Sequence, residues 1–161
     1  EVPLQMGTLS KAAGGYGGYL CTSSAVAEWI RNRARSFVYT TGLPPSVVAG
    51  NAAAVRRIRT DPELCRRPLA LARRLAAGLG RPPPESPIVP VVLGEEERAL
   101  AAQSALAEEG FLVQAIRPPT VPERSARLRI TVRAPHTEED VDRLARTLAD
   151  FPSVARTAEA P

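Results

Sequence analysis

Near its start the chain reads Gly7-Thr8-Leu9-Ser10-Lys11-Ala12-Ala13-Gly14-Gly15-Tyr16-Gly17-Gly18, which holds five of its 11 glycines and its single lysine, Lys11. A lysine that attacks a carbonyl must be neutral part of the time, which requires desolvation or a nearby cation. Glycines on both sides let the backbone close around a flat ligand without Cβ clashes, and Thr8 can donate a hydrogen bond to a phosphate. A surface lysine in a flexible loop is the alternative, and spacing alone leaves both open.

This glycine pattern differs from the common nucleotide-binding motifs. A P-loop needs Gly-x-x-x-x-Gly-Lys-Ser/Thr, which Gly7 to Lys11 does not supply, and Leu20 stands where a dinucleotide-binding pattern needs its third glycine. A Ser-His-Asp triad would have to use His136, the only histidine, which we interpret as structural.

The residues that follow predict a strand and then helices. The apolar run Tyr19-Leu20-Cys21-Thr22 indicates a buried strand. A helix is predicted over residues 24–35, capped by the serines at its start. Residues 37–45 predict an extended link. Two further helices are predicted over residues 45–59, opened by proline, and 62–77, which has an apolar stripe of leucines.

The clearest break in the sequence is Gly78-Leu79-Gly80 followed by Arg81-Pro82-Pro83-Pro84. Glycine is typical of a helix end, and the prolines stiffen the exit. We therefore place a domain border here, between residues 1–80 and a smaller domain at residues 85–161.

The second domain is predicted as strand, helix, strand, strand, helix. Its first strand, Ile88-Val89-Pro90-Val91-Val92-Leu93, contains a proline that suggests an edge strand or a bulge. The first helix, residues 95–109, directs Leu100 and Leu106 inward. Strands follow at residues 111–116 and 126–134, and the latter alternates apolar and polar residues.

Thr137 caps the last helix, with Asp140 in capping-box position. These elements predict a small α+β unit in which helices cover one face of a sheet.

Composition excludes several classes of protein. With 161 residues, 44% hydrophobic and 24% charged, the chain is typical of a globular protein and not of a disordered one. No apolar run approaches the ~20 residues that span a bilayer, and two cysteines and one histidine cannot form a structural zinc site. The net charge is +4, but arginines alternate with glutamates and aromatics are only 4%, so we expect no nucleic-acid partner. The opening residues resemble neither an initiator nor a signal peptide, which suggests the interior of a longer protein.

Two arginines of the second domain are candidates for binding a carboxylate, because guanidinium groups pair with carboxylates through two parallel hydrogen bonds. Arg117 ends a strand at a turn stiffened by prolines, and Arg129 lies in the middle of a strand on its polar face. A solvated surface arginine is the alternative at each position.

Taken together, these stretches resemble the α-oxoamine synthase family of pyridoxal-phosphate enzymes. The glycine-rich stretch with Lys11 is similar to the family's cofactor-lysine segment. The segment Ser36-Phe37-Val38-Tyr39-Thr40-Thr41-Gly42-Leu43-Pro44-Pro45 is similar to the phosphate-contact segment that follows it. The segments Ala115-Ile116-Arg117-Pro118-Pro119-Thr120-Val121-Pro122 and Ala126-Arg127-Leu128-Arg129-Ile130-Thr131 are closest to the member that condenses L-alanine with a pimeloyl thioester. The resemblance covers about residues 6–150.

The resemblance implies an α/β fold, the C-terminal part of the aspartate-aminotransferase-like fold of pyridoxal-phosphate-dependent transferases. Residues 1–80 would be the tail of the large domain and residues 85–161 the small domain. It also implies a cytoplasmic homodimer with shared active sites, no metal and no membrane partner. Because the family's large domain has more strands than residues 1–80 supply, that part should expose apolar surface.

Cofactor roles follow from the same resemblance. Lys11 would hold pyridoxal 5'-phosphate covalently and then act as acid and base, and Thr8 would donate to its phosphate. Thr40 and Thr41 would reach the phosphate bound by the partner subunit.

Substrate roles follow likewise. Arg129 would bind the amino-acid carboxylate, and Arg117 and Thr120 would line the substrate site. Other members of the family, which form 5-aminolevulinate or 2-amino-3-oxobutyrate, are the alternative. A non-catalytic module derived from such an enzyme is another.

Two features depart from the family pattern. Family members carry a glycine near Glu123-Arg124-Ser125, which this chain lacks, so that turn is expected to differ. The family's first half, which supplies an aspartate, a stacking histidine and a glycine-rich phosphate turn, is absent. We therefore expect these 161 residues alone to be inactive.

Overall fold

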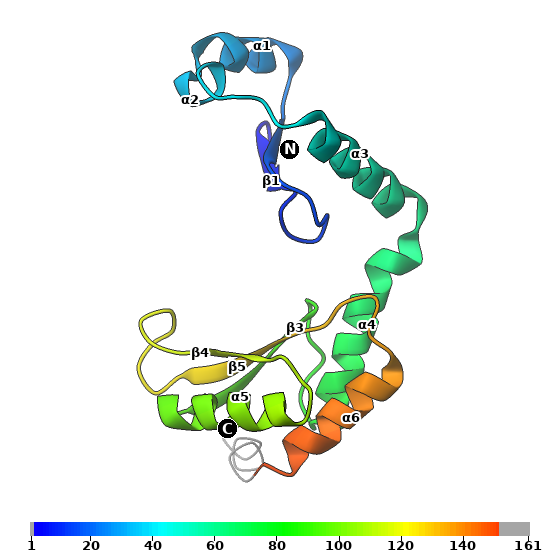
Figure 1. The fold of residues 1–161 in the computed structure, drawn as a ribbon, viewed down its shortest axis with the longest axis vertical. Helices are drawn as coiled ribbons and strands as arrows, with labels where there is room; N and C mark the ends of the chain where they lie inside the picture. The colour runs from blue at the N-terminus through cyan, green and yellow to red at the C-terminus, as the bar shows by residue number, and fades with distance from the viewer. Residues whose placement is uncertain (1, 152–161) are drawn as a thin grey trace. The chain divides into compact units, whose positions relative to one another are not determined.

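The computed structural model describes residues 2–151 and forms two compact units, Glu1–Pro62 and Glu63–Pro161 (Figure 1). We call them the first and second unit. The elements of the first unit are β1 (Gln5–Thr8), β2 (Gly18–Cys21), α1 (Ser24–Arg33), α2 (Arg35–Val38) and α3 (Pro45–Thr60). Those of the second are α4 (Pro62–Gly78), β3 (Ile88–Gly94), α5 (Glu96–Glu108), β4 (Gln114–Ile116), β5 (Ala126–Thr131) and α6 (Glu138–Ala149).

In the first unit, the predicted strand and helices are present, and the structure adds two elements that were not predicted, β1 and α2. The backbone leaves helical geometry at Ala34, so the helix predicted to residue 35 ends at Arg33. A single turn of helix, α2, then replaces the start of the predicted extended link, because Val38 and Tyr39 donate backbone hydrogen bonds to Ala34 and Arg35. Proline in the first turn of α3 agrees with its prediction.

The first unit has no hydrophobic core among its described residues. Every buried apolar side chain of residues 2–151 lies at position 71 or later. The strand β2, predicted to be buried, is exposed along its whole length. Large apolar side chains stay open, including Trp29 at 66% and Tyr39 at 77% exposure. The predicted exposure of apolar surface is therefore confirmed, and the predicted burial of β2 is wrong because no layer covers it.

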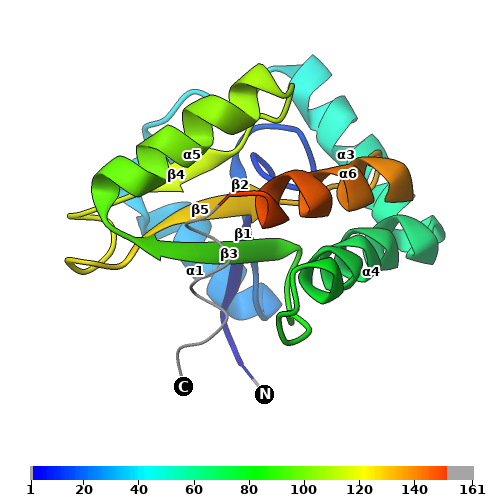
Figure 2. The same ribbon diagram turned by 90° about the horizontal axis from the view of Figure 1, so that it is seen from below.

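The second unit contains the predicted order of strands and helices around a three-stranded antiparallel sheet, β3-β5-β4. Along β5, Leu128 and Ile130 are buried while Arg129 and Thr131 are exposed, so one face of the sheet is covered. Figure 2 shows α5 lying along the sheet and α6 beside α4. The core contains side chains from β3, β5 and all three helices of this unit, among them Leu75, Val91, Leu106, Leu128 and Leu148.

The position of Pro90 agrees with its prediction. β3 is an edge strand, and its register with β5 shifts between Val92 and Gly94. An edge strand and a bulge both tolerate the missing N–H donor of proline. The prediction for Leu100 is wrong, because this side chain of α5 is 37% exposed while Leu106 is fully buried.

The helix α4 packs within the second unit. Leu71 and Leu75 lie in the core of the second unit, and Gly78 faces Ala145 of α6, where an added Cβ would lie 2.9 Å from the alanine Cβ. The packed units therefore divide at Pro62, ahead of the glycine–proline break at residues 78–84. The assignment of residues 1–80 and 85–161 to two domains of a parent fold stays a prediction.

Charged contacts fix α6 against α4. Thr137 and Asp140 form the predicted capping box at the start of α6. Arg74 of α4 binds Asp142 through two hydrogen bonds of 2.7 Å and pairs with Glu138 at 2.7 Å. The hydrogen bond from the Thr137 amide lowers the pKa of Asp140, and the hydrogen bond from Arg74 lowers the pKa of Asp142.

The turn at Glu123-Arg124-Ser125 contains a left-handed residue. Ser125 donates its backbone N–H to the Pro122 carbonyl, and Arg124 has a φ of 56°. It is the only described non-glycine residue with positive φ. Arg124 therefore adopts a conformation that a Cβ disfavours, and the expected difference of this turn from the family stays a prediction.

Arg124→Gly should therefore raise the free energy of unfolding of the second unit by about 0.5–1 kcal/mol, because glycine adopts positive φ without steric strain. The midpoint of urea unfolding measures this change. As a control, Arg98→Gly on the exposed side of α5 should lower the stability by about 1 kcal/mol. Equal destabilisation by both variants would contradict the inference of strain at Arg124.

The second unit should also lose stability in acid. Because the pKa values of Asp140 and Asp142 are lowered in the folded chain, their stabilisation is complete above the unfolded carboxyl value of about 3.9 and is lost as the pH falls through the folded values. Urea midpoints measured between pH 6 and pH 2 should decrease below about pH 4. Asp142→Asn should weaken this dependence, whereas Glu85→Gln, an exposed carboxyl, should leave it unchanged.

Candidate functional site

The segment Leu9–Gly17, which we call the lysine loop, joins the antiparallel strands β1 and β2. The strands pair Gln5 with Cys21 through to Thr8 with Gly18. Inside the loop, Leu9 donates its N–H to the Gly17 carbonyl at 2.9 Å, and Gly15 donates to the Leu9 carbonyl at 2.8 Å. These bonds close the base of the loop below Lys11.

Glycine is required at several points of this closure. Gly17 has a φ of 97°, and Gly14, which donates to the Lys11 carbonyl at 3.0 Å, has a φ of 63°. At Gly7, an added Cβ would lie 2.4 Å from the ring of Tyr19. The glycines therefore allow the close approach of backbone and side chains in this loop, and the predicted closure around a flat ligand stays a prediction.

Two hydroxyl groups lie beside the lysine in sequence and bond to each other. The Oγ atoms of Thr8 and Ser10 are 2.7 Å apart, and the Ser10 N–H donates to Thr8 Oγ1 at 3.2 Å. Lys11 is exposed, and among residues 2–151 its ammonium group has no hydrogen bond or ion pair. The loop thus presents one primary amine and a pair of hydroxyls on a closed backbone. Ser10 was not among the predicted site residues, although its hydroxyl and its place next to Lys11 could have indicated it.

Thr40 and Thr41 follow α2 and are exposed. The Thr40 hydroxyl donates to the carbonyl of Ser36 one turn earlier. Within the described residues, neither threonine forms a hydrogen bond with the lysine loop, and their predicted role toward a partner subunit stays a prediction.

In the second unit, Arg129 lies on the open face of the sheet. It is exposed in the central strand β5, between its register partners Pro90 on β3 and Gln114 on β4. No carboxylate of residues 2–151 pairs with it. Its guanidinium is therefore available to an external carboxylate.

Arg117 differs, because it already has an acidic partner. It directly follows β4 and forms an ion pair with Glu96 in the first turn of α5. Thr120 donates its backbone N–H to the Arg117 carbonyl at 3.0 Å, which closes the turn that holds both predicted residues. Glu96 was not predicted, because a single sequence does not indicate which distant residues form an ion pair.

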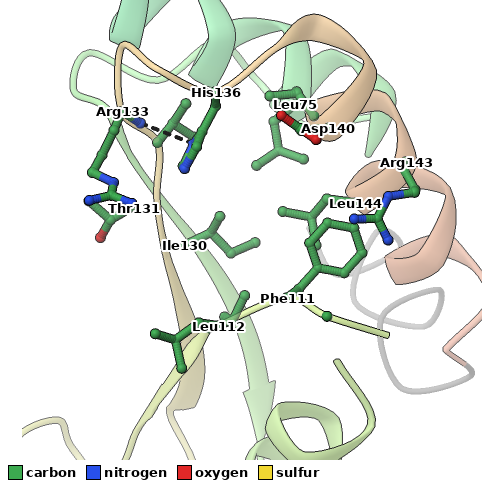
Figure 3. Close-up of a pocket in the computed structure, with 14 residues that line it drawn as sticks. Leu75, Phe111, Leu112, Ile130, Thr131, Arg133, His136, Asp140, Arg143 and Leu144 are labelled. Atoms are coloured by element: carbon green, nitrogen blue, oxygen red, sulfur yellow. Dashed lines mark hydrogen bonds between the residues drawn. The ribbon is translucent and has the colours of Figure 1, made fainter. Parts of the chain in front are cut away.

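A hollow of about 540 Å³ also lies in the second unit, between β5 and the start of α6 (Figure 3). Its apolar walls include Leu75, Phe111 and Ile130. Among its polar side chains, His136 Nδ1 accepts from the Arg133 amide, and the Arg143 guanidinium stacks at 4.0 Å on the Phe111 ring. The hydrogen bond of His136 agrees with the structural role predicted for this residue.

The structure brings together Thr8, Ser10 and Lys11 in the first unit and Arg117 and Thr120 in the second. The described residues contain no cluster of three or more His, Cys, Asp or Glu side chains that could hold a metal ion. No helix of the described chain has the length and apolar character to cross a membrane.

Comparison with known proteins places these features in context. Residues 2–148 match the family model of aminotransferase class I and II. The chain is 60% identical over 149 residues to the 8-amino-7-oxononanoate synthase of Methylobacterium nodulans, a match that covers 92% of this chain and 39% of that relative. The chain spans about 40% of the length of the curated relatives it matches.

Solved structures are similar over nearly the whole chain. A serine palmitoyltransferase from S. paucimobilis with a bound PLP–myriocin aldimine has a TM-score of 0.82 at 30% identity, covering 98% of this chain and 40% of that one. The 8-amino-7-oxononanoate synthase of Francisella tularensis has a TM-score of 0.76 at 22% identity, covering 97% of this chain and 45% of that one. At this identity the second likeness concerns the fold alone.

Gly17→Ala in the full-length protein should loosen the base of the lysine loop. A residue with Cβ at a φ of 97° is strained, so the Leu9 amide should exchange with solvent about 5- to 30-fold faster, as 1–2 kcal/mol implies. Hydrogen exchange with mass spectrometry measures the rate. Gly42→Ala, where an added Cβ meets nothing within 4 Å, should leave it unchanged; equal rates in both variants would contradict the predicted closure.

Proposed function

Because the chain belongs to the aminotransferase class I and II family, whose model matches its residues 2–148, we propose that it forms the lysine-bearing part of an 8-amino-7-oxononanoate synthase. The predicted fold class, the C-terminal part of the aminotransferase-like fold, is confirmed by that match and by the similar solved structures. The proposed reaction is the decarboxylative condensation of L-alanine with a pimeloyl thioester. Its products are 8-amino-7-oxononanoate, CO2 and the free thiol carrier, in the synthesis of biotin.

The observation that carries this proposal is the lysine loop. Its single amine, Lys11, stands on a backbone closed by the Leu9–Gly17 and Gly15–Leu9 hydrogen bonds. The chain that carries it is 60% identical over 149 residues to a relative of this name. Gly14 and Gly17 adopt positive φ, which allows the loop to close.

The residues of the loop fit pyridoxal 5'-phosphate. The cofactor carries an aldehyde and a phosphate, and the loop offers a primary amine and two hydroxyls whose oxygens are 2.7 Å apart. Glycine at position 7, where a Cβ would collide with Tyr19, keeps the strand beside these hydroxyls free of bulk. Bound pyridoxal phosphate supplies an electron sink that stabilises negative charge at the α-carbon of an amino acid.

The chain's own groups would then act as follows. Lys11 Nζ would hold the cofactor through its aldehyde carbon and, once released from it, would move a proton to and from the substrate's α-carbon. Thr8 Oγ1 donates to the phosphate, and Ser10 Oγ, bonded to Thr8, fixes the direction of that hydroxyl. Arg129 binds the amino-acid carboxylate from the open face of the sheet.

Arg117 and Thr120 would line the substrate site. The ion pair with Glu96 holds the Arg117 guanidinium in one direction, which suits positioning better than capture of a free carboxylate. Thr40 and Thr41 would reach the phosphate held by the partner subunit of a homodimer. The homodimer and a cytoplasmic location both come from the family resemblance.

A second candidate is a related acyltransferase with another amino acid. The solved serine palmitoyltransferase is similar in fold and 30% identical, and synthases of 5-aminolevulinate or 2-amino-3-oxobutyrate would share the same groups. The higher identity to 8-amino-7-oxononanoate synthases favours alanine. Product analysis of the full-length enzyme with alanine, glycine or serine separates these reactions. A non-catalytic module would form no product with any of them.

Borohydride reduction of the full-length protein in the presence of pyridoxal phosphate should attach the cofactor to Lys11. Peptide mapping by mass spectrometry locates the label, and the Lys11→Ala variant should show none on this segment. The purified 161-residue chain should have no condensing activity. Label on another lysine, or no label, would contradict the proposed role of Lys11.

A further inference from the structure

Asn51 is the single buried residue among the described residues of the first unit. It lies within α3, and only 6% of its surface is exposed. Asparagine is mostly exposed in folded proteins, and a buried one needs hydrogen-bond partners. Burial of a polar side chain in a unit that buries no apolar one indicates a specific contact.

That contact is with the lysine loop. Asn51 Nδ2 donates to the carbonyl of Tyr16 at 2.9 Å, across 35 positions of sequence. Its Oδ1 is buried without a hydrogen-bond partner among the described residues. This oxygen lies 1.8 Å from the place that a Cβ on Gly15 would occupy. The side-chain amide therefore fills the space beside Gly15 and holds the next residue through its carbonyl.

Gly15 and Tyr16 lie in the part of the loop that leads from Lys11 back to β2. Gly15 and Gly17, on either side of Tyr16, make the two backbone hydrogen bonds to Leu9. A single side chain at this point therefore links both sides of the loop's base to helix α3. Leu9 in turn precedes the Ser10-Lys11 pair.

We propose that Asn51 is a positioning residue, which ties the lysine loop to α3 and sets the direction from which the Lys11 amine acts. This inference rests on the proposed function. The amide suits the role because Nδ2 supplies a donor to a carbonyl that is otherwise unpaired at this point. Gly15 complements it by leaving room for Oδ1.

The chain offers a matched pair of variants, because its two asparagines differ in burial. Asn51→Asp keeps the size of the side chain but replaces the donor with an acceptor-only carboxylate facing the Tyr16 carbonyl. Asn32→Asp makes the same change on the exposed surface of α1, where Nδ2 donates to Glu28.

In the full-length enzyme loaded with pyridoxal phosphate, Asn51→Asp should lower kcat about 10- to 100-fold, since small misplacements of a reacting group have effects of this size. The KM for the amino acid should change less, because Arg129 binds it independently. The pH at which the bound cofactor's absorbance changes should also shift, because that change reports on Lys11. Asn32→Asp should leave all three unchanged.

Hydrogen exchange of the lysine loop provides a readout that does not depend on activity. In Asn51→Asp the Gly15 amide should exchange at least about 10-fold faster, as expected for a lost buried hydrogen bond. If Asn51→Asp does not fold, Gly15→Ala, which displaces the amide from the other side, should produce the same shift in pH dependence and exchange.

Unchanged pH dependence and unchanged loop exchange in Asn51→Asp would overturn the proposal. Absence of label on Lys11 in the unaltered enzyme would contradict the proposed function instead. In that case the exchange rates alone decide whether Asn51 anchors the loop.

Discussion

The lysine loop is carried by a part of the chain that has no hydrophobic core of its own. Buried apolar side chains of residues 2–151 all come from position 71 onward, while Trp29, Phe37 and Tyr39 remain more than 60% exposed. Since apolar burial is the main source of stability, the helices of the first unit need further protein against them. The direction of Lys11 therefore depends on contacts that reach it through this unit, of which Asn51 supplies the one buried example.

The second unit, by comparison, contains its own hydrophobic core. One face of its sheet is covered by apolar side chains and the other presents arginines, so the same alternation in β5 that builds the core also directs Arg129 outward. The core of the second unit therefore holds the exposed face that carries Arg129 in place by contacts within that unit. Under the proposed function, the core of the second unit thus holds Arg129 in position for the substrate. The glycines of the first unit shape the loop that binds the cofactor.

Much of this was predictable from the sequence, for local reasons. Prolines, glycines and the alternation of residues 126–134 indicate element ends and faces, and Thr137 with Asp140 indicates a capping box. What was missed depends on tertiary packing. The predicted burial of β2 is wrong because no layer of the described residues covers this strand. Of the candidate site, Lys11 and Thr8 follow from local pattern, whereas the partners Glu96 and Asn51 come from distant segments and leave no local signal.

Native-state hydrogen exchange of the 161-residue chain, compared with the same residues in the full-length protein, tests the contrast between the two units most directly. Amides of β5 should exchange slowly in both, because Leu128 and Ile130 are buried within the second unit. Amides of α1 and α3 should exchange quickly in the short chain and slowly in the full-length protein. Equal protection of α1, α3 and β5 in the short chain would contradict the dependence of the lysine-bearing unit on further protein.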